Sequence, residues 1–291
     1  MNNKPEFGTK EWASKNENLI KGCSNDCKYC YAKAMTIQHK KNTQEEWKNE
    51  IVNQGKLRKG FRKYDGRIMF PSSHDITPEH LYDCMTFLSH ILKSGNNVLV
   101  VSKPHLICIK PICDYLKEYK DNILFRFTIG SADSNVLKFW EPNAPDFDER
   151  LKSLKYAYSA GYQTSVSCEP MLDDKIDQVI VKVLPYVTET IWIGKPNKLN
   201  ERLSMNGFKN DQATMEAASR LMRLFSDEYI LNLCAKYQDN PKIMWKDSIK
   251  KVVEKNQKKM PVELCRDLLR VFLGGVALTT FSSIFKTVIL C

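Results

Sequence analysis

Strand-like runs alternate with helix-like stretches over the first two-thirds of the chain, and this alternation most limits the possible folds. The strand-like runs are apolar or β-branched and bounded by turn residues; they are 18–21, 67–70, 97–102, 124–129, 163–167 and 188–193. The helix-like stretches are 32–52, 78–93, 106–120, 147–160 and 175–184. Such alternation predicts a parallel sheet with right-handed crossovers. An open doubly wound sheet and a full or partial barrel both fit, and both place functional side chains at the carboxyl ends of the strands.

The composition is that of a folded, soluble protein. The 291 residues suffice for one large α/β domain or two small ones, and 43% are hydrophobic and 27% charged. This balance excludes wholesale disorder, a collagen-like repeat and a polytopic membrane protein. The N-terminus lacks the basic-then-apolar pattern of a secretory signal, and ten cysteines without one suggest a reducing compartment. We therefore expect a cytoplasmic location.

Positive charge is concentrated in two segments of the chain, whose formal net charge is +10. Residues 1–70 hold fifteen Lys or Arg against eight Asp or Glu, and residues 242–259 hold seven Lys against two acids. Two basic segments on a near-neutral body could attract DNA or RNA. The alternative is that these lysines simply keep helices solvated.

The pattern turns helical after residue 200. Helix-like stretches lie at 212–225, 227–237 and, after Asn240-Pro241, at 244–259. We divide the chain into a core domain at 1–200, a basic helical region at 201–260 and a tail at 261–291. The apolar tail segment, 268–291, is too short between its charges for a membrane span, so a docking or core helix is favoured over a tail anchor or a surface-bound helix.

Three cysteines form the most specific motif. Cys23, Cys27 and Cys30 are spaced by three and two residues within Gly-Cys-Ser-Asn-Asp-Cys-Lys-Tyr-Cys-Tyr-Ala, directly after the first strand-like run. Thiolates in a compact loop suit a soft metal or an iron–sulfur cluster. Three ligands leave one position open for a substrate, whereas a closed zinc site takes four. His39 is a candidate fourth zinc ligand, but the chain has no second Cys-x-x-Cys motif.

The Cys-x-x-x-Cys-x-x-Cys motif, with an aromatic residue before its third cysteine, resembles the signature of radical S-adenosylmethionine (SAM) enzymes. The longer string around it resembles the branch that contains spore photoproduct lyase. Phe139-Trp140-Glu141-Pro142 and Asp148-Glu149-Arg150-Leu151 agree with that branch, and the similarity covers roughly residues 8–200. The resemblance implies a partial (β/α)6 TIM-like barrel, with the helical C-terminal region as an extension.

The resemblance also implies a mechanism. Cys23, Cys27 and Cys30 would hold a [4Fe–4S] cluster whose fourth iron binds SAM. An electron from a flavodoxin- or ferredoxin-type donor would cleave SAM, and the resulting 5′-deoxyadenosyl radical would abstract hydrogen from a substrate. The cofactor then carries the hard chemistry, while the protein positions it and excludes water.

Several strand ends match SAM-binding positions of the family. Ser73 and Asp75 match contacts to the SAM amino group, and Lys103 matches a lysine that pairs with the SAM carboxylate. Thr128 matches a hydroxyl contact on the fourth strand, and Tyr31 matches an aromatic residue near the adenosyl group. The structural alternatives are a capping turn, a surface lysine and a core tyrosine.

Two residues at the fifth strand-like run are candidate catalytic groups. Glu169 is placed to bind substrate or the SAM ribose, or else caps a helix. The hydrogen-donor cysteine of the lyase has no counterpart, since Pro71 and Ser72 stand in its place; Cys168 is a possible substitute or a packed core thiol. Repair of thymine lesions is therefore not expected. Nucleic acid is the first candidate substrate, and a protein or a small molecule stays open. A non-catalytic iron–sulfur sensor is the alternative function.

Overall fold

A seven-stranded parallel sheet organises the computed structural model, which describes residues 8–257. The strand order is β1-β4-β5-β6-β7-β8-β9, and every neighbouring pair is parallel. The strands are β1 (Lys15–Asn16), β4 (Arg67–Phe70), β5 (Asn97–Ser102), β6 (Ile123–Thr128), β7 (Gln163–Cys168), β8 (Ile191–Ile193) and β9 (Ile243–Trp245). β1 and β9 are not paired with each other, so the sheet is an open partial barrel. The expected α/β architecture is confirmed.

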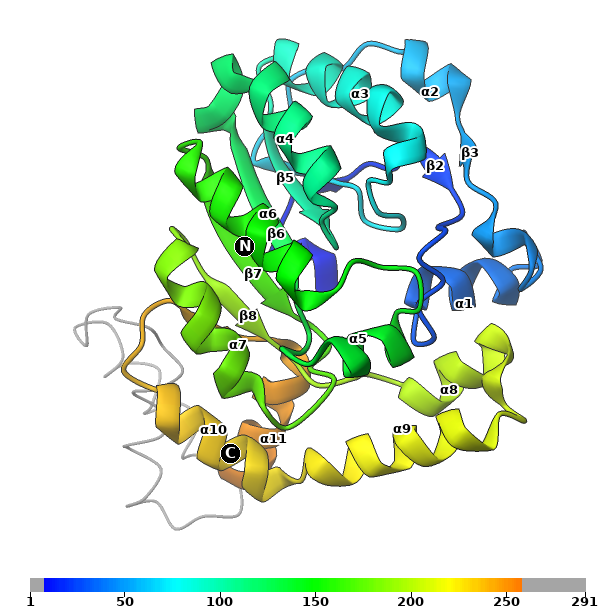
Figure 1. Ribbon diagram of the computed structural model, residues 1–291, viewed down its shortest axis with the longest axis vertical. Coiled ribbons are helices and arrows are strands. Elements are labelled where there is room, and N and C mark those ends of the chain that lie inside the picture. The colour runs from blue at the N-terminus through cyan, green and yellow to red at the C-terminus, as the bar shows by residue number, and fades with distance from the viewer. Residues whose placement is uncertain (1–7, 258–291) are drawn as a thin grey trace, which may run out of the picture.

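Helices cover the outer face of this sheet (Figure 1). The helices are α1 (Tyr31–Gln38), α2 (Gln54–Arg58), α3 (Leu81–Lys93), α4 (Leu106–Tyr115), α5 (Ser134–Trp140), α6 (Phe147–Ser159), α7 (Ile176–Val183), α8 (Leu199–Leu203), α9 (Gln212–Leu224), α10 (Asp227–Tyr237) and α11 (Asp247–Gln257). The apolar faces of α3, α4, α6 and α7 are buried in one large core cluster with the strands. The crossovers thus run in the β-then-α order that the sequence predicts.

Alternate residues of each strand face opposite sides of the sheet, because the side-chain period of a strand is two. Ile68 and Phe70 of β4 pack into the large cluster beneath the helices. Met69, between them, joins a small inner cluster with Leu99 and Leu124 of the next two strands. The helical side is therefore a continuous apolar core, and the inner side leaves room for polar groups.

The first strand-like run, 18–21, is not one strand of the main sheet. β1 ends before it and pairs with β4, whereas Ile20–Lys21 forms β2, which pairs antiparallel with β3 (Ile51–Val52). The prediction was wrong because β1 is only two residues long, and its place in the sheet depends on pairing with β4.

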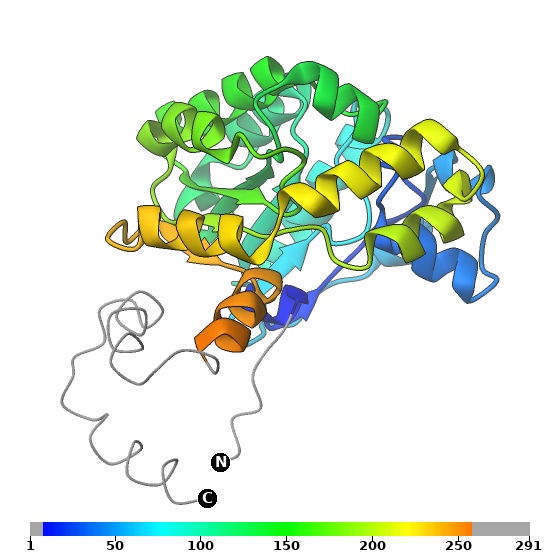
Figure 2. The same ribbon diagram turned by 90° about the horizontal axis from the view of Figure 1, so that it is seen from below.

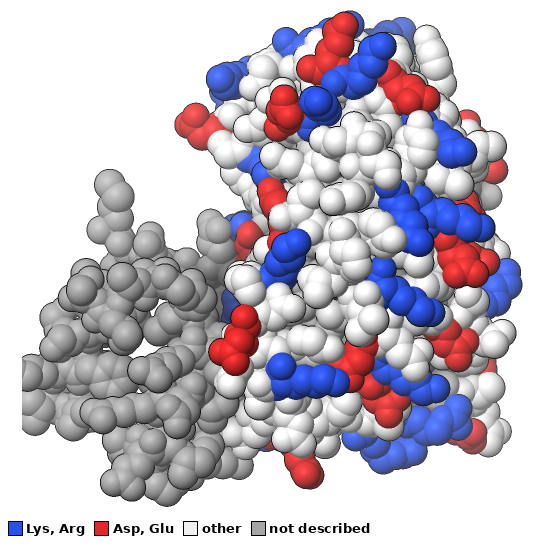
Figure 3. All heavy atoms as spheres, turned by 60° about the vertical axis from the view of Figure 1, so that its left-hand side comes forward, with Lys and Arg blue, Asp and Glu red and all other residues white. Residues whose placement is uncertain are grey.

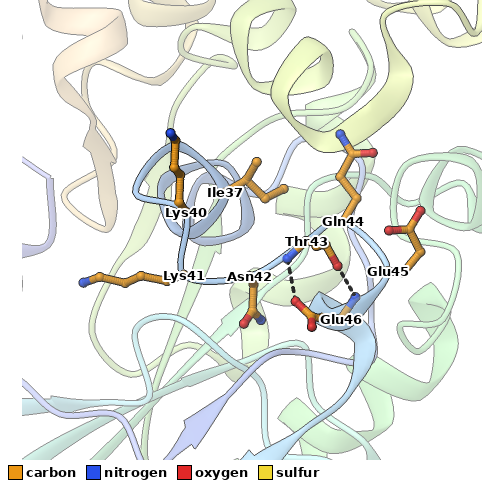
Figure 4. A pocket seen from close by; sticks show the side chains of 8 residues that line it. All are labelled: Ile37, Lys40, Lys41, Asn42, Thr43, Gln44, Glu45 and Glu46. Carbon is orange, nitrogen blue, oxygen red and sulfur yellow. Dashed lines mark hydrogen bonds between the residues drawn. The ribbon is translucent and has the colours of Figure 1, made fainter.

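The prediction of one helix over 32–52 was also wrong, because α1 ends at Gln38. Lys40 has a positive φ of 52°, which interrupts a helix. Thr43 and Glu46 then form a capping box: the Thr43 N–H donates to Glu46 Oε2 (2.8 Å) and the Glu46 N–H donates to Thr43 Oγ1 (3.2 Å) (Figure 4). The Thr-x-x-Glu pattern marks the start of a new helical turn inside the stretch that was predicted to be one helix.

The C-terminal region is not entirely helical. β9 adds the seventh strand beside β8, and its pairing register joins Ile191 to Ile243. The prediction had placed residues 244 and 245 at the start of a helix, which begins instead at Asp247. Three residues carry too little periodicity to identify a strand whose stability comes from its neighbour.

Helix α9 crosses the molecule between two packed regions (Figures 1 and 2). At its N-terminal end, α8 and a single π-helical turn, η6 (Ser204–Phe208), lie beside α1. At its C-terminal end, α10 binds α7 through an ion pair between Lys236 and Asp177 (2.6 Å). The region after residue 200 therefore contacts both the cysteine-bearing end and the helical layer of the sheet domain.

The predicted tail, 261–291, lies outside the described residues, as does its apolar segment 268–291. Within residues 8–257, no helix has both the length and the hydropathy needed to cross a membrane.

Candidate active site

The three cysteines lie on a tightly constrained loop between β2 and α1. Gly22 opens the loop with φ of +93°, and a Cβ on it would lie 2.4 Å from the Asn49 carbonyl oxygen, so only glycine fits there. The Cys23 N–H donates to the Trp47 carbonyl (2.8 Å), and the Cys30 N–H donates to the Cys27 carbonyl (3.1 Å). These bonds turn the loop so that all three cysteines line one cavity.

Burial raises the pKa of all three thiols, because a thiolate loses its solvation there. Backbone N–H groups at the start of α1 oppose this effect at Cys30, whose Sγ accepts from the Lys33 N–H (3.4 Å). Without a bound cation the thiols favour their protonated form. A cluster iron supplies the charge that makes thiolates stable in such a place, and this donor set suits an iron–sulfur cluster.

The cavity has a volume of about 580 Å³ and lies at the carboxyl ends of the sheet strands. That volume falls in the ordinary range of small-molecule and cofactor sites. The candidate site residues that line it, besides the three cysteines, are Tyr31, Ser73, Asp75, Lys103, Thr128 and Glu169. They come from five segments that are far apart in the sequence, and the parallel sheet brings them together.

Cys168 does not line the cavity. It is fully buried in the core cluster under the helices, whereas Ser167 and Glu169 on either side of it face the cavity. The two-residue period of β7 accounts for this difference. The structure therefore keeps the Cys168 thiol away from the other candidate site residues.

Hydrogen bonds from neighbouring residues fix the carboxylate of Asp75. Its Oδ1 accepts from the Lys103 N–H (2.7 Å) and the Ser102 hydroxyl (3.0 Å), and its Oδ2 accepts from the Asn25 amide (2.8 Å). The Lys103 ammonium lies 3.5 Å from Oδ2. Burial acts to raise the pKa of Asp75, but Lys103 and these hydrogen bonds outweigh burial and lower it. The carboxylate thus joins the cysteine loop to β5, and its acceptor positions are filled by protein groups.

Asn18 arranges the turn after β4. Its side-chain oxygen accepts from the N–H groups of Ser72 (2.7 Å) and Ser73 (2.8 Å), and its amide donates to the Ser72 hydroxyl (2.9 Å). The Tyr31 hydroxyl donates to the Ser72 carbonyl. Within the described residues the Ser73 hydroxyl has no hydrogen-bond partner, so it is available to a ligand. Asn18 was missed in the sequence, where an Asn beside a strand carries no distinct signal.

A buried network supports the cysteine loop from beneath. The Tyr29 hydroxyl and the Arg150 guanidinium both donate to the Glu141 carboxylate, and the Arg150 and Glu141 side chains are fully buried. Arg150 also donates to the Thr128 carbonyl (3.1 Å). The two motifs that carry the resemblance, one holding Glu141 and the other Arg150, therefore meet in space under the cysteines.

Glu169 faces Lys246, which follows β9. The Lys246 ammonium lies 3.6 Å from Glu169 Oε2, also binds Glu11, and lies 4.2 Å from the Trp12 ring centroid. Burial raises the pKa of Glu169, and Lys246 opposes this. Lys246 was missed in the sequence; the available signal was a lysine directly after an apolar run, Ile-Met-Trp, as Lys103 follows Val-Val-Ser.

Further cavity-lining residues were also missed. Lys10 and Trp12 come from the N-terminal segment, Asn197 from the loop after β8, and Arg202 from α8. Lys195, which follows β8, also lines the cavity. Within residues 8–257, no three His, Cys, Asp or Glu side chains converge as the ligands of a single metal ion would.

One curated protein is similar to part of this chain. An uncharacterised protein, ORF301 of Acidianus two-tailed virus, is 24% identical over 169 residues, which are 53% of this chain and 54% of that protein. The chain thus matches about half the length of this curated relative.

Solved structures show the fold. Spore photoproduct lyase with bound AdoMet and dinucleoside spore photoproduct superposes with a TM-score of 0.52 at 15% identity, over 71% of this chain and 64% of that one. A single-residue variant of the lyase gives 0.52 at 16% identity, over 84% and 79%.

The model of the radical SAM superfamily matches residues 18–183, which include the cysteine loop and β4 to β7. That superfamily uses a [4Fe–4S] cluster and SAM. On this match, together with the fold and the three cysteines at the cavity, the chain belongs to the radical SAM superfamily.

Proposed function

We propose that this protein cleaves SAM reductively at a [4Fe–4S] cluster held by Cys23, Cys27 and Cys30, and abstracts hydrogen from a substrate in the same cavity. One observation carries the proposal: the three cysteines open onto a single cavity together with Ser73, Lys103 and other polar strand-end residues. When bound, the cluster and SAM supply the electron transfer and the radical chemistry that no protein side chain offers.

Lys103 is proposed to bind the SAM carboxylate. Its side chain is 14% exposed and lies in the cavity wall, and only Asp75 pairs with it among the described residues. Burial disfavours its charged form, but nearby acidic groups, Asp75 first among them, raise the pKa of Lys103, so it stays cationic at neutral pH. A partly buried ammonium is a strong anchor for a carboxylate.

Ser73, Tyr31 and Thr128 are proposed as further SAM contacts, and Glu169 as a contact to substrate or ribose. The Ser73 hydroxyl is available to accept from an amino group, and the Tyr31 ring offers an apolar face at the cavity wall. Asp75 is proposed to act indirectly, since its oxygens already bind Lys103, Ser102 and Asn25. It would orient the Lys103 ammonium.

Cys168 has no part in this proposal. A hydrogen donor must reach the substrate radical, and the Cys168 thiol lies on the other face of the sheet from the cavity.

We also propose a flavodoxin- or ferredoxin-type electron donor and a cytoplasmic location. The eight cysteines within residues 8–257 form no disulfide, which supports a reducing compartment.

Nucleic acid remains a candidate substrate. The structure, however, weakens the argument for it that rests on the basic segment 242–259. Lys246 and Lys250 bind Glu11, and Lys255 binds Asp227 (2.8 Å), so much of that charge is compensated within the protein. The face that Figure 3 shows has basic and acidic side chains interspersed. The support that remains is the N-terminal basic segment and the likeness to the lyase branch.

The test uses anaerobically reconstituted full-length protein with dithionite and SAM, followed by chromatography for 5′-deoxyadenosine. We expect deoxyadenosine from the wild type and none from the Cys23→Ala, Cys27→Ala and Cys30→Ala variants. Cys234→Ala, a buried cysteine of α10, is the matched control and should keep the activity. An intact cluster that neither binds nor cleaves SAM would contradict this proposal and favour the non-catalytic sensor instead.

A further inference from the structure

Six charged side chains line the cavity, and they are not balanced. The acids are Asp75 and Glu169, and the bases are Lys10, Lys103, Lys195 and Arg202. Each acid already lies beside a lysine: Lys103 is 3.5 Å from Asp75, and Lys246, which also binds Glu11, is 3.6 Å from Glu169. The other three bases therefore leave positive charge at the cavity.

Lys10, Lys195 and Arg202 make no ion pair with any carboxylate within residues 8–257. Asp227, the acid whose pKa Lys195 helps to lower, is bound to Lys255 at 2.8 Å. Arg202 is half-buried, and burial lowers its pKa because the guanidinium loses water. Glu169 and Glu201 oppose this shift from a distance, but neither forms an ion pair with Arg202. Such a cation is stabilised when an anion enters the cavity.

The three cations reach the cavity from three separate segments. Lys10 belongs to the N-terminal 3-10 turn, Lys195 to the loop after β8, and Arg202 to α8. The Arg202 guanidinium lies 6.0 Å from the Tyr31 ring centroid, directly beside the cysteine loop. If an anionic group of the substrate bound there, the remaining atoms of the substrate would lie near the three cysteines.

SAM itself does not account for an anion at these three cations. SAM carries one carboxylate against an ammonium and a sulfonium, and Lys103 is already proposed for that carboxylate. A guanidinium and two ammonium groups that line the same cavity are matched by a phosphate, which presents several oxygens around its negative charge. We propose that Lys10, Lys195 and Arg202 bind a phosphate group of the substrate; this inference rests on the proposed function.

The experiment measures phosphate affinity in the assembled protein. Inorganic pyrophosphate is titrated calorimetrically into anaerobic, cluster-containing protein saturated with SAM, and sodium acetate serves as the carboxylate comparison. The variants are Arg202→Gln and Lys195→Gln. The matched control is Arg223→Gln, which removes the same charge from an exposed position on α9. Iron content and the SAM dissociation constant are measured on every sample.

We expect pyrophosphate to bind the wild type and the control equally and more tightly than acetate. Arg202→Gln and Lys195→Gln should each weaken that binding by about tenfold or more, as expected for a lost charge-assisted hydrogen bond. Iron content and SAM affinity should not change. A single-stranded decanucleotide that competes with pyrophosphate identifies a nucleic-acid phosphodiester as the source, and pyrophosphate binding without oligonucleotide binding identifies a free phosphorylated molecule.

Three outcomes would overturn the inference: no pyrophosphate binding to the wild type, equal weakening in Arg223→Gln, or a loss of SAM affinity in Arg202→Gln. The last would assign Arg202 to SAM itself. Deoxyadenosine formation in the same wild-type sample separates the two proposals. If it forms without phosphate binding, only this inference fails; if it does not form, the proposed function fails.

Discussion

The side-chain amide of Asn206 donates to the backbone carbonyl of Cys30 at 2.9 Å, and also to that of Lys28 at 2.9 Å. Asn206 is 2% exposed and lies in the π-helical turn after α8, outside the segment that matches the superfamily model. The C-terminal region thus fixes the backbone of the cysteine loop. π-Helical turns of this kind occur frequently at functional sites.

Replacing Asn206 should loosen the cluster. Asn206→Ala removes two hydrogen bonds and leaves two buried carbonyls with fewer donors, which should cost about 2 kcal/mol of unfolding free energy. We expect lower iron and sulfide content after reconstitution and a cluster that bleaches faster in air. The control is Asn200→Ala at an exposed position of α8. Equal iron content and equal bleaching in both variants would show that the contact does not hold the loop.

Cys168→Ala should keep its activity. The thiol faces the core, so its loss removes one buried sulfur and should lower stability by about 1 kcal/mol. Deoxyadenosine formation should stay within about twofold of the wild type, because this energy acts on folding and not on the reaction. The measurement pairs a urea titration with the deoxyadenosine assay. A loss of deoxyadenosine formation at unchanged stability would show that the Cys168 thiol takes part in the reaction.

Lys103→Gln should weaken SAM binding by about tenfold to a hundredfold, because a charge-assisted contact to the carboxylate is lost. Asp75 keeps the three hydrogen bonds described above, so iron content should fall little. Calorimetry with SAM and the change in the cluster's EPR spectrum on SAM addition report the effect. Lys93→Gln, exposed on α3, is the control. A variant that binds SAM as tightly as the wild type excludes this role.

Asp177→Asn should destabilise the docking of α10 on α7 in a pH-dependent way. Partial burial acts to raise the pKa of Asp177, but the hydrogen bonds from Lys236 and Tyr237 outweigh it and lower the pKa below its ordinary value. A lowered carboxyl pKa stabilises the fold above the unfolded-state pKa, and this stabilisation is lost as the pH falls through the folded-state value.

The expected cost of Asp177→Asn at pH 7 is below about 1 kcal/mol, since the ion pair is half exposed and screened by solvent. The difference from the wild type should shrink as the pH falls through the folded-state pKa. Urea titrations at neutral and acidic pH measure it, with Asp239→Asn at an exposed position as the control. A cost that stays constant with pH would mean that the carboxylate charge is not what stabilises this contact.

Much of the sheet could be predicted from local pattern. The runs 67–70 and 97–102 coincide with β4 and β5, because strands buried by covering helices are continuous apolar segments. β1 and β9 could not be predicted, since two or three residues become a strand only through a neighbour. The break after α1 differs from these, because the capping box of Thr43 and Glu46 is a local Thr-x-x-Glu pattern that the sequence itself contains.

The family and the candidate cluster ligands can be identified from the sequence alone, because the spacing of Cys23, Cys27 and Cys30 is a local property of one loop. The sequence also indicated which strand ends carry polar side chains. The tertiary structure was needed to show which of these share a cavity, that Cys168 faces the core, and that Asn206 binds the cysteine loop. Those relationships join segments far apart in the chain, and they depend on strand register and on helix packing, which no short stretch of sequence specifies.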